Sequence, residues 1–478
     1  MNRDTTNNIL FVDMDGTLFK SDLLFESLIW LLRNDLLTLL FQVPFWLLQG
    51  KAKFKQNLAN RVSLDIETQP LSEQFTDYIK REVERGRRAV LISASHESVV
   101  RKASAHLDIF IDAIGTDGIT NLKGDAKLQH ILHLCGPQPF SYAGNSKDDI
   151  PIWLAADEII CVNTSPSVIR KIKRKTESKI LEFDSPNNPW KTFIRSLRPH
   201  QWLKNSLIFL PLILSHQLLS FKALLNTSVG FISFCFVASA VYLLNDLIDI
   251  ENDRNHPEKI KRPFASGNLS LTWGVITVPI LLLTGFAVGH TLGNQFMKAL
   301  LIYWLLTVFY SFFLKRFFLL DALILSVLYG LRIVIGSAAI NVDTTSWLLN
   351  FTLSLFLGLA FLKRYVELSN QRKLGNTRFI GRGYHIKDLR LISCLGVISN
   401  LISVVIFGFY ITAGETAQLY ENFELLWIIN LIIAGLLLRT WRLAYSGRIQ
   451  EDPVLFVLSD RFSQIASVMC GALIWLAI

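Results

Sequence analysis

The sequence has little cysteine, and none of it is spaced as a metal site requires. The five cysteines are scattered, and two or three of them lie in apolar runs, which indicates reduced thiols in a core or facing lipid. They are Cys135, Cys161, Cys235, Cys394 and Cys470. The polar stretch 1–8 also lacks the basic and apolar regions of a signal peptide, so we expect the domain that follows to stay in the cytoplasm.

The composition fits neither a single soluble domain nor a chain that lies wholly in the membrane. Of 478 residues, 51% are hydrophobic and 18% are charged, with a mean hydropathy of +0.36. This balance predicts two domains, one soluble and one embedded in lipid. The net charge of +9 does not favour nucleic-acid binding, because the basic residues stand mainly between apolar runs, as membrane topology requires.

A short apolar run over residues 9–18 is typical of a buried strand, and it ends in two aspartates. Asp13 and Asp15 are two residues apart, so at a strand end their side chains point to the same side. Gly16 then lets the chain enter a turn. In such a pair one carboxylate can attack phosphorus and the other can transfer protons, with Mg²⁺ holding the phosphate.

Three further motifs follow in order. Residues 89–95 have the pattern of a second buried strand that ends in a hydroxyl, residues 123–127 open a helix, and residues 140–149 contain a strand that ends in acids. Alternating strands and helices predict an α/β, Rossmann-like domain with a parallel sheet and a site at its carboxyl edge. The four motifs together resemble those of the haloacid dehalogenase-like phosphatases. The resemblance implies this fold for residues 1–185, with a helical cap over about 20–85.

The resemblance also implies roles for individual residues. Asp13 would be the nucleophile and Asp15 the general acid and base. Ser93 would bind the phosphate and Lys127 would neutralise it, with Lys123 as the alternative. The implied ligands of Mg²⁺ are Asp13, Asp15, Asn145 and Asp149.

Asn145 departs from that family pattern. The last motif usually reads Gly-Asp, whereas this chain has Gly144 followed by Asn145, so a neutral amide replaces a charged metal ligand. An amide oxygen can bind Mg²⁺, but with less charge the affinity falls. Two hypotheses therefore stand: an active phosphatase with weakened metal binding, or a degenerate domain kept as a scaffold.

Residues 28–48 are unusually apolar for an insert in a soluble domain. The charged break at Arg33, Asn34 and Asp35, followed by Pro44, argues against a single spanning helix. Two short amphipathic helices that lie on the bilayer or on the second domain would explain the run. An ordinary cap with a buried core explains it equally well.

The remainder of the chain reads as a membrane domain. A basic run at 170–175 indicates a helix at the end of the first domain that faces anionic lipid, and a linker is expected over 186–200. From residue 201 to 478, apolar runs predict an all-α polytopic bundle of about nine transmembrane helices. The Lys and Arg residues fall on alternate sides, which places the charged loops and the first domain on the cytoplasmic face of a bacterial inner (plasma) membrane. The runs are 205–219, 224–244, 273–292, 299–314, 319–340, 347–362, 389–411, 425–438 and 463–478.

A dense set of acids and bases follows the second of these runs. On a helix Asn245, Asp249 and Asp253 recur every four residues, with Asp246 one residue further round, so their oxygens line one face. Like charges packed so closely favour a bound cation, and oxygen ligands favour Mg²⁺ completed by a phosphorylated substrate. Nearby Lys259, Lys261 and Arg262 would supply positive charge for the same phosphates. The alternative is a polar juxtamembrane loop with topology signals.

Other cations are predicted on the same side of the membrane. Lys363 and Arg364 follow the sixth run, and Arg198 and Lys204 precede the first. Arg332 stands in mid-span, where an arginine normally faces a polar cavity. Two alternatives remain: Lys363 and Arg364 as topology signals only, and Arg332 as the partner of a buried acid.

This half resembles the UbiA-like intramembrane prenyltransferases along nearly all its length, and residues 245–253 match their first aspartate-rich motif. The family fold is a nine-helix bundle with a polar pocket that faces the cytoplasm. The motifs at 198–205, 253–259 and 262–263 are most similar to the polyprenyl-phosphate phosphoribosyltransferases of that family. The resemblance implies substrate-binding roles for Arg198, Gln201, Lys204, Asn205, Lys259, Arg262, Arg332, Lys363 and Arg364, and catalytic roles with Mg²⁺ for Asn245, Asp246, Asp249 and Asp253.

The expected function is phosphoribosyl transfer from 5-phosphoribosyl 1-pyrophosphate to a polyprenyl phosphate. The first domain would then hydrolyse the 5-phosphate of the product. The usual second aspartate-rich motif is missing, since that loop offers Lys363, Arg364 and Glu367. Its absence weakens the alternative, a prenyltransferase that moves a prenyl group onto an aromatic acceptor beside a non-catalytic regulatory module. The sequence indicates no oligomeric state.

Overall fold

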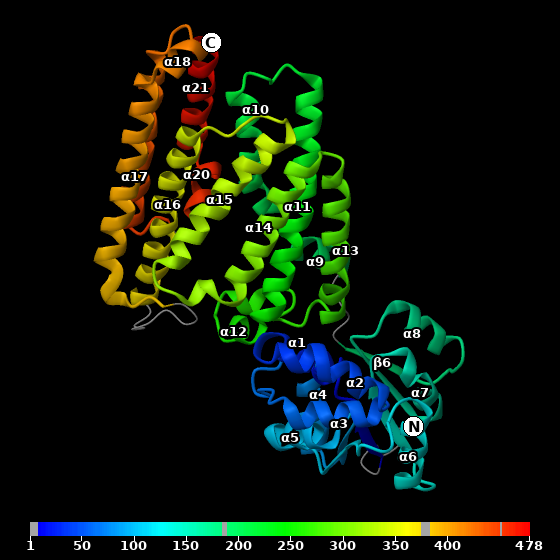
Figure 1. Ribbon diagram of the computed structural model, residues 1–478. Helices are drawn as coiled ribbons and strands as arrows, with labels where there is room; N and C mark the ends of the chain where they lie inside the picture. The colour runs from blue at the N-terminus through cyan, green and yellow to red at the C-terminus, as the bar shows by residue number, and fades with distance from the viewer. Residues whose placement is uncertain (1–7, 184–188, 374–382, 450–451) are drawn as a thin grey trace. The chain divides into compact units, whose positions relative to one another are not determined.

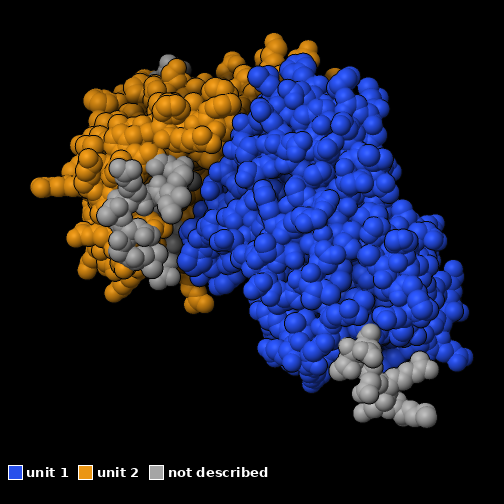
Figure 2. Space-filling model, turned by 90° about the horizontal axis from the view of Figure 1, so that it is seen from below, with its two compact units in different colours: residues 1–197, 243–277 blue, residues 198–242, 278–478 orange. Residues whose placement is uncertain are grey.

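The computed structural model describes residues 8–183, 189–373, 383–449 and 452–478. The described residues group into two compact units, coloured separately in Figure 2. Unit 1 comprises residues 1–197 and 243–277, and unit 2 comprises residues 198–242 and 278–478. The start of the predicted linker, residues 186–188, lies outside the described residues.

A six-stranded sheet forms the centre of unit 1, with every pair of neighbouring strands parallel (Figure 1). The strand order is β3-β2-β1-β4-β5-β6, which places β1 in the middle with Val12 opposite Leu91 of β2 and Ala143 of β4. The parallel, Rossmann-like sheet predicted from the sequence is therefore confirmed. The strands are β1 (Ile9–Val12), β2 (Ala89–His96), β3 (Asp112–Thr116), β4 (Phe140–Gly144), β5 (Glu158–Val162) and β6 (Ile180–Phe183).

Side chains of β1 alternate between two apolar cores. Leu10 and Val12 pack in one core with Phe75, whereas Phe11 packs in the other with Trp153. This alternation is the period of two that a strand buried on both faces requires, and it holds β1 rigidly beneath the residues that follow it. The helices of this part are α4 (Glu73–Glu84), α5 (Glu97–Leu107), α6 (Asp125–Cys135), η3 (Lys147–Asp149), α7 (Ile150–Ala155) and α8 (Pro166–Lys173).

The insert between β1 and β2 is helical and broken where the sequence predicts. The side chain of Asp35 accepts hydrogen bonds from the backbone N–H and the hydroxyl of Thr38, which starts a new helical segment after α1, and Pro44 opens the next helix. Leu31, Phe54 and neighbouring apolar residues form a small core beneath. The segments are α1 (Leu23–Asn34), η2 (Thr38–Gln42), α2 (Val43–Leu48) and α3 (Lys51–Arg61).

Seven helices of the described residues are long and apolar enough to cross a membrane, or eight if the pair α20 and α21, bent by 72°, forms one span. The chain is therefore an integral membrane protein, whereas the predicted count of nine spans is not confirmed. The seven are α11 (Phe221–Ile248), α13 (Leu271–His290), α14 (Asn294–Phe312), α15 (Leu320–Ala339), α16 (Ser346–Lys373), α17 (Leu389–Thr412, preceded by η7, Ile386–Asp388) and α19 (Leu425–Tyr445). The bent pair is α20 (Pro453–Ser459) and α21 (Arg461–Ala477).

The first predicted span, residues 205–219, has a different structure. Its residues form the end of η4 (Pro199–Phe209) and the short helix α10 (Leu210–Leu214). Gly336 of α15 explains how this segment is held, because a Cβ at that position would lie 2.2 Å from the carbonyl oxygen of Ile208. Because glycine has no side chain, the backbone of η4 can pack directly against α15. This contact places Lys204 and Asn205 close to Arg332.

The other short elements join these helices. They are α9 (Pro189–Ser196), α12 (Ile250–Arg254), η5 (Lys259–Lys261), η6 (Leu314–Arg316) and α18 (Gly414–Leu419). Of these, α12 carries the end of the aspartate-rich stretch, and η5 carries two of the basic residues that follow it.

Candidate functional site

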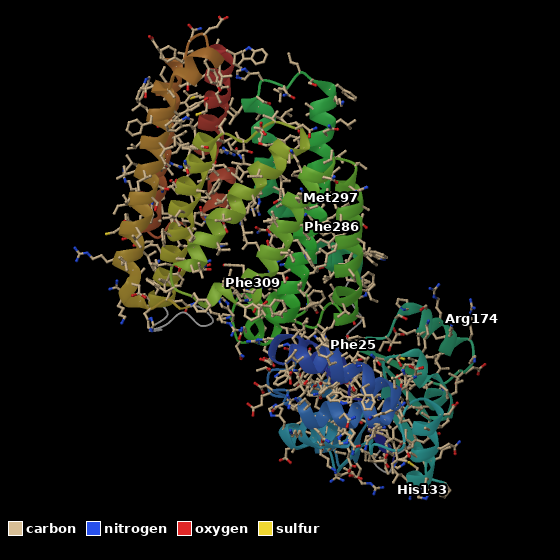
Figure 3. The ribbon with its side chains drawn as sticks, viewed as in Figure 1. Phe25, His133, Arg174, Phe286, Met297 and Phe309 are labelled. Atoms are coloured by element: carbon tan, nitrogen blue, oxygen red, sulfur yellow. The ribbon has the colours of Figure 1, made fainter. Side chains whose placement is uncertain are left out.

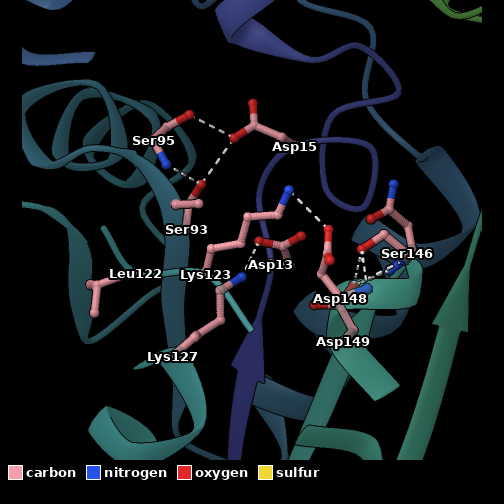
Figure 4. Close-up of polar contacts among 12 residues, drawn as sticks. Asp13, Asp15, Ser93, Ser95, Leu122, Lys123, Lys127, Ser146, Asp148 and Asp149 are labelled. Atoms are coloured by element: carbon pink, nitrogen blue, oxygen red, sulfur yellow. Dashed lines mark hydrogen bonds and ion pairs between the residues drawn. The ribbon is translucent and has the colours of Figure 1, made fainter. Parts of the chain in front are cut away.

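The carboxyl end of β1 presents Asp13 to a buried lysine (Figure 4). Lys127 of α6 donates to Asp13 over 2.7 Å, and both side chains are almost completely buried. Burial, opposed by Lys127, raises the pKa of the Asp13 carboxyl to about 7. Lys123 pairs instead with Asp148 at the surface, over 2.9 Å. The structure thus brings Lys127, rather than its alternative Lys123, to the predicted nucleophile.

Asp15 is held by two hydroxyls at the end of β2. Ser93 and Ser95 donate to the same oxygen, Oδ2, over 2.9 and 2.7 Å, and the backbone N–H of Leu23 donates to Oδ1 over 2.9 Å. These bonds fix the carboxylate two residues after Asp13, at the edge of the sheet where the sequence places it. Ser95 was not among the predicted site residues, although it stands at the end of the second buried strand.

The carboxylate of Asp149 accepts hydrogen bonds from the backbone of its own loop. Its Oδ2 accepts from the N–H groups of Asn145 and Ser146 and from the Ser146 hydroxyl, and its Oδ1 accepts from the hydroxyl of Tyr142 over 2.7 Å. Asn145 lies against the turn after the nucleophile, since a Cβ on Gly16 would stand 2.0 Å from its Nδ2 atom. Predicted Asn145 and Asp149 thus lie in the loop beside the turn that carries Asp13 and Asp15.

The aspartate-rich stretch begins at the end of α11 and continues into α12. Asp249 stands at the junction, yet backbone bonds from Asp249 to Asn245 and from Asp253 to Asp249 keep the helical repeat, so the predicted common face survives the break. Arg262 donates through one atom, Nη1, to Asp246 over 3.1 Å and to Asp253 over 2.6 Å.

Two carboxylates therefore converge on a single cationic nitrogen. Burial, opposed by Arg262, raises the pKa of Asp253 to about 6. Across the described ranges, no group of three or more His, Cys, Asp or Glu side chains stands ready to hold a metal ion. The fit to Mg²⁺ thus rests on two aspartates whose carboxylates converge on the position now taken by the Arg262 nitrogen. Phosphate oxygens would be needed to complete the coordination shell of the ion.

In unit 2 two lysines converge on one aspartate. Lys204 of η4 and Lys363 of α16 both donate to Oδ2 of Asp452, over 2.8 and 2.6 Å. The other oxygen of Asp452 accepts from the N–H of Val454 and caps α20. Asp452 was not predicted. The signal for it was an aspartate followed by Pro453 between two apolar runs, which is the pattern of a helix start.

Arg332 is buried in α15 among aromatic rings. Its guanidinium lies 4.9 to 5.5 Å from three ring centroids, donates to the side-chain oxygen of Asn205 over 3.2 Å and to the carbonyl of Leu328 over 2.6 Å. The described residues thus give it an amide, a carbonyl and ring faces as partners, in place of the buried acid considered above. The rings belong to Phe234, Tyr303 and Tyr329.

Arg364, in contrast, is engaged by acids. It forms ion pairs with Asp321 over 2.5 Å and with Glu367, and the hydroxyl of Tyr310 donates to Asp321 over 2.6 Å. Two carboxylates therefore already surround this guanidinium. Its predicted contact with a substrate phosphate stays a prediction.

The remaining predicted residues lie around η4 and η5. Arg198 places its guanidinium 5.6 Å from the ring centroid of Tyr242. Gln201 is half-buried in η4, and Lys259 is half-buried at the start of η5. Their substrate contacts remain untested predictions.

The described residues thus combine apolar helices long enough to cross a membrane, a parallel Rossmann-like sheet, and acids and bases grouped near helix ends. The profile of the UbiA prenyltransferase family matches residues 208–465, more than half of the chain. The chain belongs to this family. The phosphatase resemblance of residues 1–185 remains a prediction.

Relatives cover the chain to different extents. The uncharacterized protein y4nM of Sinorhizobium fredii is 35% identical over 95% of this chain and 88% of its own length. The nodulation protein NoeC of Azorhizobium caulinodans is 31% identical over 58% of this chain and 90% of its own. The decaprenyl-phosphate phosphoribosyltransferase of Corynebacterium glutamicum is 30% identical over 48% of this chain and 71% of its own. The similarity to y4nM therefore extends over nearly the whole chain.

Proposed function

We propose that the protein transfers phosphoribose from 5-phosphoribosyl 1-pyrophosphate to a polyprenyl phosphate at the cytoplasmic face of the inner membrane. A relative named for this type of activity supports the proposal, together with the motif around residues 198–205. The observation that carries it is the convergence of Asp246 and Asp253 on one nitrogen of Arg262. Such a pair suits a cation-bound pyrophosphate.

The transfer makes one bond and breaks one. An oxygen of the lipid phosphate attacks the anomeric carbon of the ribose, and the bond from that carbon to pyrophosphate breaks. The acceptor is already an anion, so no strong general base is required. Asp246 and Asp253, with Asn245 and Asp249, would hold Mg²⁺, which supplies charge neutralisation for the leaving pyrophosphate.

We assign the cations of unit 2 to the binding of phosphate groups. Lys204 and Lys363 share a single carboxylate, so the group of three carries a net charge of +1 at neutral pH. A bound phosphate can neutralise this remaining positive charge without displacing Asp452. Arg332 holds its charge among ring faces, where a second anion would meet little competing water.

We further propose that the N-terminal domain hydrolyses the 5-phosphate of the product. Asp13 would attack phosphorus while Asp15 donates a proton to the departing ribose oxygen, and a water activated by Asp15 would then release inorganic phosphate from Asp13. The contact of Lys127 with Asp13 supports this role, because an adjacent cation favours the ionised nucleophile. Hydrolysis of the phosphomonoester would make the first step irreversible.

The test is mass spectrometry of the lipid product formed by the purified full-length protein. The wild type should give polyprenyl phosphoryl ribose, whereas Asp13→Asn and Lys127→Gln should accumulate the 5-phosphorylated lipid at an unchanged transfer rate. Lys123→Gln is the matched control, since its pair with Asp148 is exposed. Transfer of phosphoribose by the wild type without release of inorganic phosphate would contradict the phosphatase proposal and leave the transferase proposal intact.

A second arm of the assay tests the transferase proposal itself. Prenyl diphosphate with an aromatic acid replaces both substrates in a parallel reaction. Prenylation of the aromatic acid, without any transfer of phosphoribose, would replace the proposed substrates by those of the alternative.

A further inference from the structure

The cap of the N-terminal domain carries a large exposed apolar surface. We call it the cap apolar face and define it by Leu36, Leu37, Leu40, Phe41, Phe45 and Leu48. Each of these side chains is exposed by 45% to 85%, although all lie within 13 consecutive residues. A contiguous apolar patch of this kind is rare on a surface that faces only water.

The cap does not need this face for its own core. Val43, Leu39 and Trp46 alternate with the exposed residues in the same segment and pack on Leu31 and Phe54. One side of η2 and α2 therefore completes the cap, and the other is left for a partner. This two-sided arrangement answers the question raised by the sequence, because the apolar run serves both a buried core and an outer surface.

Contacts within unit 1 tie the cap to α12, the short helix that follows α11 in the chain. Glu26 of α1 accepts from Arg254 of α12 over 2.6 Å, with both side chains 2% exposed, and Arg33 pairs with Glu251 over 3.0 Å. Both parts can be followed in Figure 1, where α1 lies beside α12. Because α12 starts two residues after the last residue of the spanning helix α11, these pairs join α1 to a segment that directly follows a spanning helix in the chain.

The cap apolar face follows directly from that anchored helix. Only Asp35 separates α1 from Leu36. The apolar helix over Thr38–Leu48 is too short to span a bilayer, and exposed basic side chains, Lys51 and Lys53, come immediately after it. An apolar surface flanked by lysines is what an in-plane helix presents to the boundary between headgroups and acyl chains of anionic lipids.

We propose that the cap apolar face inserts into the lipid bilayer and anchors the N-terminal domain to the membrane surface. The partner is lipid, not the transmembrane unit or a second copy of the chain. The inference is independent of the proposed function.

The test uses the full-length protein in vesicles that contain anionic lipid. Cys394 and Cys470 are replaced by serine, because the other three cysteines are buried, and a polarity-sensitive fluorophore is attached through Phe41→Cys. His133→Cys is the matched control, since His133 is exposed in the same domain and lies far from Phe25 of α1 (Figure 3). Lipids spin-labelled near the carbonyl end of the acyl chain serve as the quencher.

The label at position 41 should lose its fluorescence to the spin-labelled lipid, and the label at 133 should not. A blue-shifted but unquenched label at 41 would mean that protein covers the face, and an unshifted label would mean that water does. Either result overturns the proposal. Equal quenching at both positions also overturns it, because the effect would then belong to the label.

A second pair of variants tests the same face without touching the cap core. A label placed through Leu48→Cys should be quenched in the otherwise unchanged chain, and the quenching should be lost when Leu37→Asp and Phe41→Asp are added. Both substituted side chains are more than two-thirds exposed, so the cap should still fold. Full quenching in the presence of both aspartates contradicts insertion through this face.

Discussion

Two charge clusters in this protein are arranged as opposites. In unit 1 two carboxylates, Asp246 and Asp253, share one nitrogen of Arg262, so two negative charges and one positive charge leave −1. In unit 2 two ammonium groups, Lys204 and Lys363, share one oxygen of Asp452, which leaves +1. By charge alone, the first cluster favours an additional cation and the second an additional anion.

Removal of the single acid from the lysine cluster should have the largest effect. Asp452→Asn leaves two ammonium groups side by side without a counter-charge, which is expected to destabilise the protein by about 3 kcal/mol. Inorganic pyrophosphate should stabilise this variant more than the wild type, because the anion replaces the lost charge. The measurement is thermal unfolding in detergent with and without pyrophosphate, with the exposed Asp343→Asn as control. Equal unfolding of variant and wild type would contradict the charge assignment.

Loss of one acid from the aspartate cluster should have the second-largest effect. Asp253→Asn removes half of the converging negative charge, and we expect transfer to slow by about 100-fold, as for other groups that stabilise charge in a transition state. Glu258→Gln is the control, since this carboxylate is exposed and its one ion pair within the described ranges is with Lys261 over 3.3 Å. Phosphoribosyl transfer is measured with increasing Mg²⁺. An unchanged rate for Asp253→Asn would remove this cluster from the proposed site.

Acid should weaken metal binding at the aspartate cluster. The pKa of Asp253 is raised to about 6, so protons compete with cations there as the pH falls through 6, and the ionised fraction then drops about tenfold per pH unit. The apparent affinity for Mg²⁺ should weaken over this range. A metal affinity that does not change between pH 8 and pH 5 would be evidence against Asp253 as a ligand.

The smallest effect is expected from removal of the guanidinium that the two aspartates share. Arg262→Gln changes the net charge of the aspartate cluster from −1 to −2, and divalent ions should bind about fivefold more tightly, an effect that salt reduces. Stabilisation of the purified protein by Mg²⁺ alone, without substrate, measures this affinity. The matched variant Lys261→Gln, which has no contact with these aspartates among the described residues, should behave as the wild type. Weaker metal binding by Arg262→Gln would show that the arginine does not occupy the position of a cation.

The local features of the site could be predicted from the sequence. The spacing of Asp13 and Asp15 after an apolar run placed both at the end of a central strand, and the recurrence of Asn245, Asp249 and Asp253 placed them on one helical face. Each of these patterns depends on neighbours within eight residues. The periods of strands and helices are properties of the backbone, so they hold before any tertiary contact forms.

The long-range partners could not be predicted. Asp452 meets Lys204 and Lys363 from positions 248 and 89 residues away in the chain, and no spacing rule connects them. Arg364 reads in the sequence like a phosphate-binding residue, yet the fold surrounds it with two acids. The first apolar run likewise reads as a span, but close packing of η4 on Gly336 gives it another form.

The sequence by itself determined the parallel sheet, the membrane helices and the spacing of the acids, because hydropathy and backbone periodicity act over short distances. Only the tertiary structure decided how the charges are shared. Packing between elements far apart in the chain decides three things. It brings Lys127 to Asp13, it places Asp452 between Lys204 and Lys363, and it encloses Arg332 in aromatic rings. Burial then fixes the partners, since a charge removed from water must find a compensating group nearby.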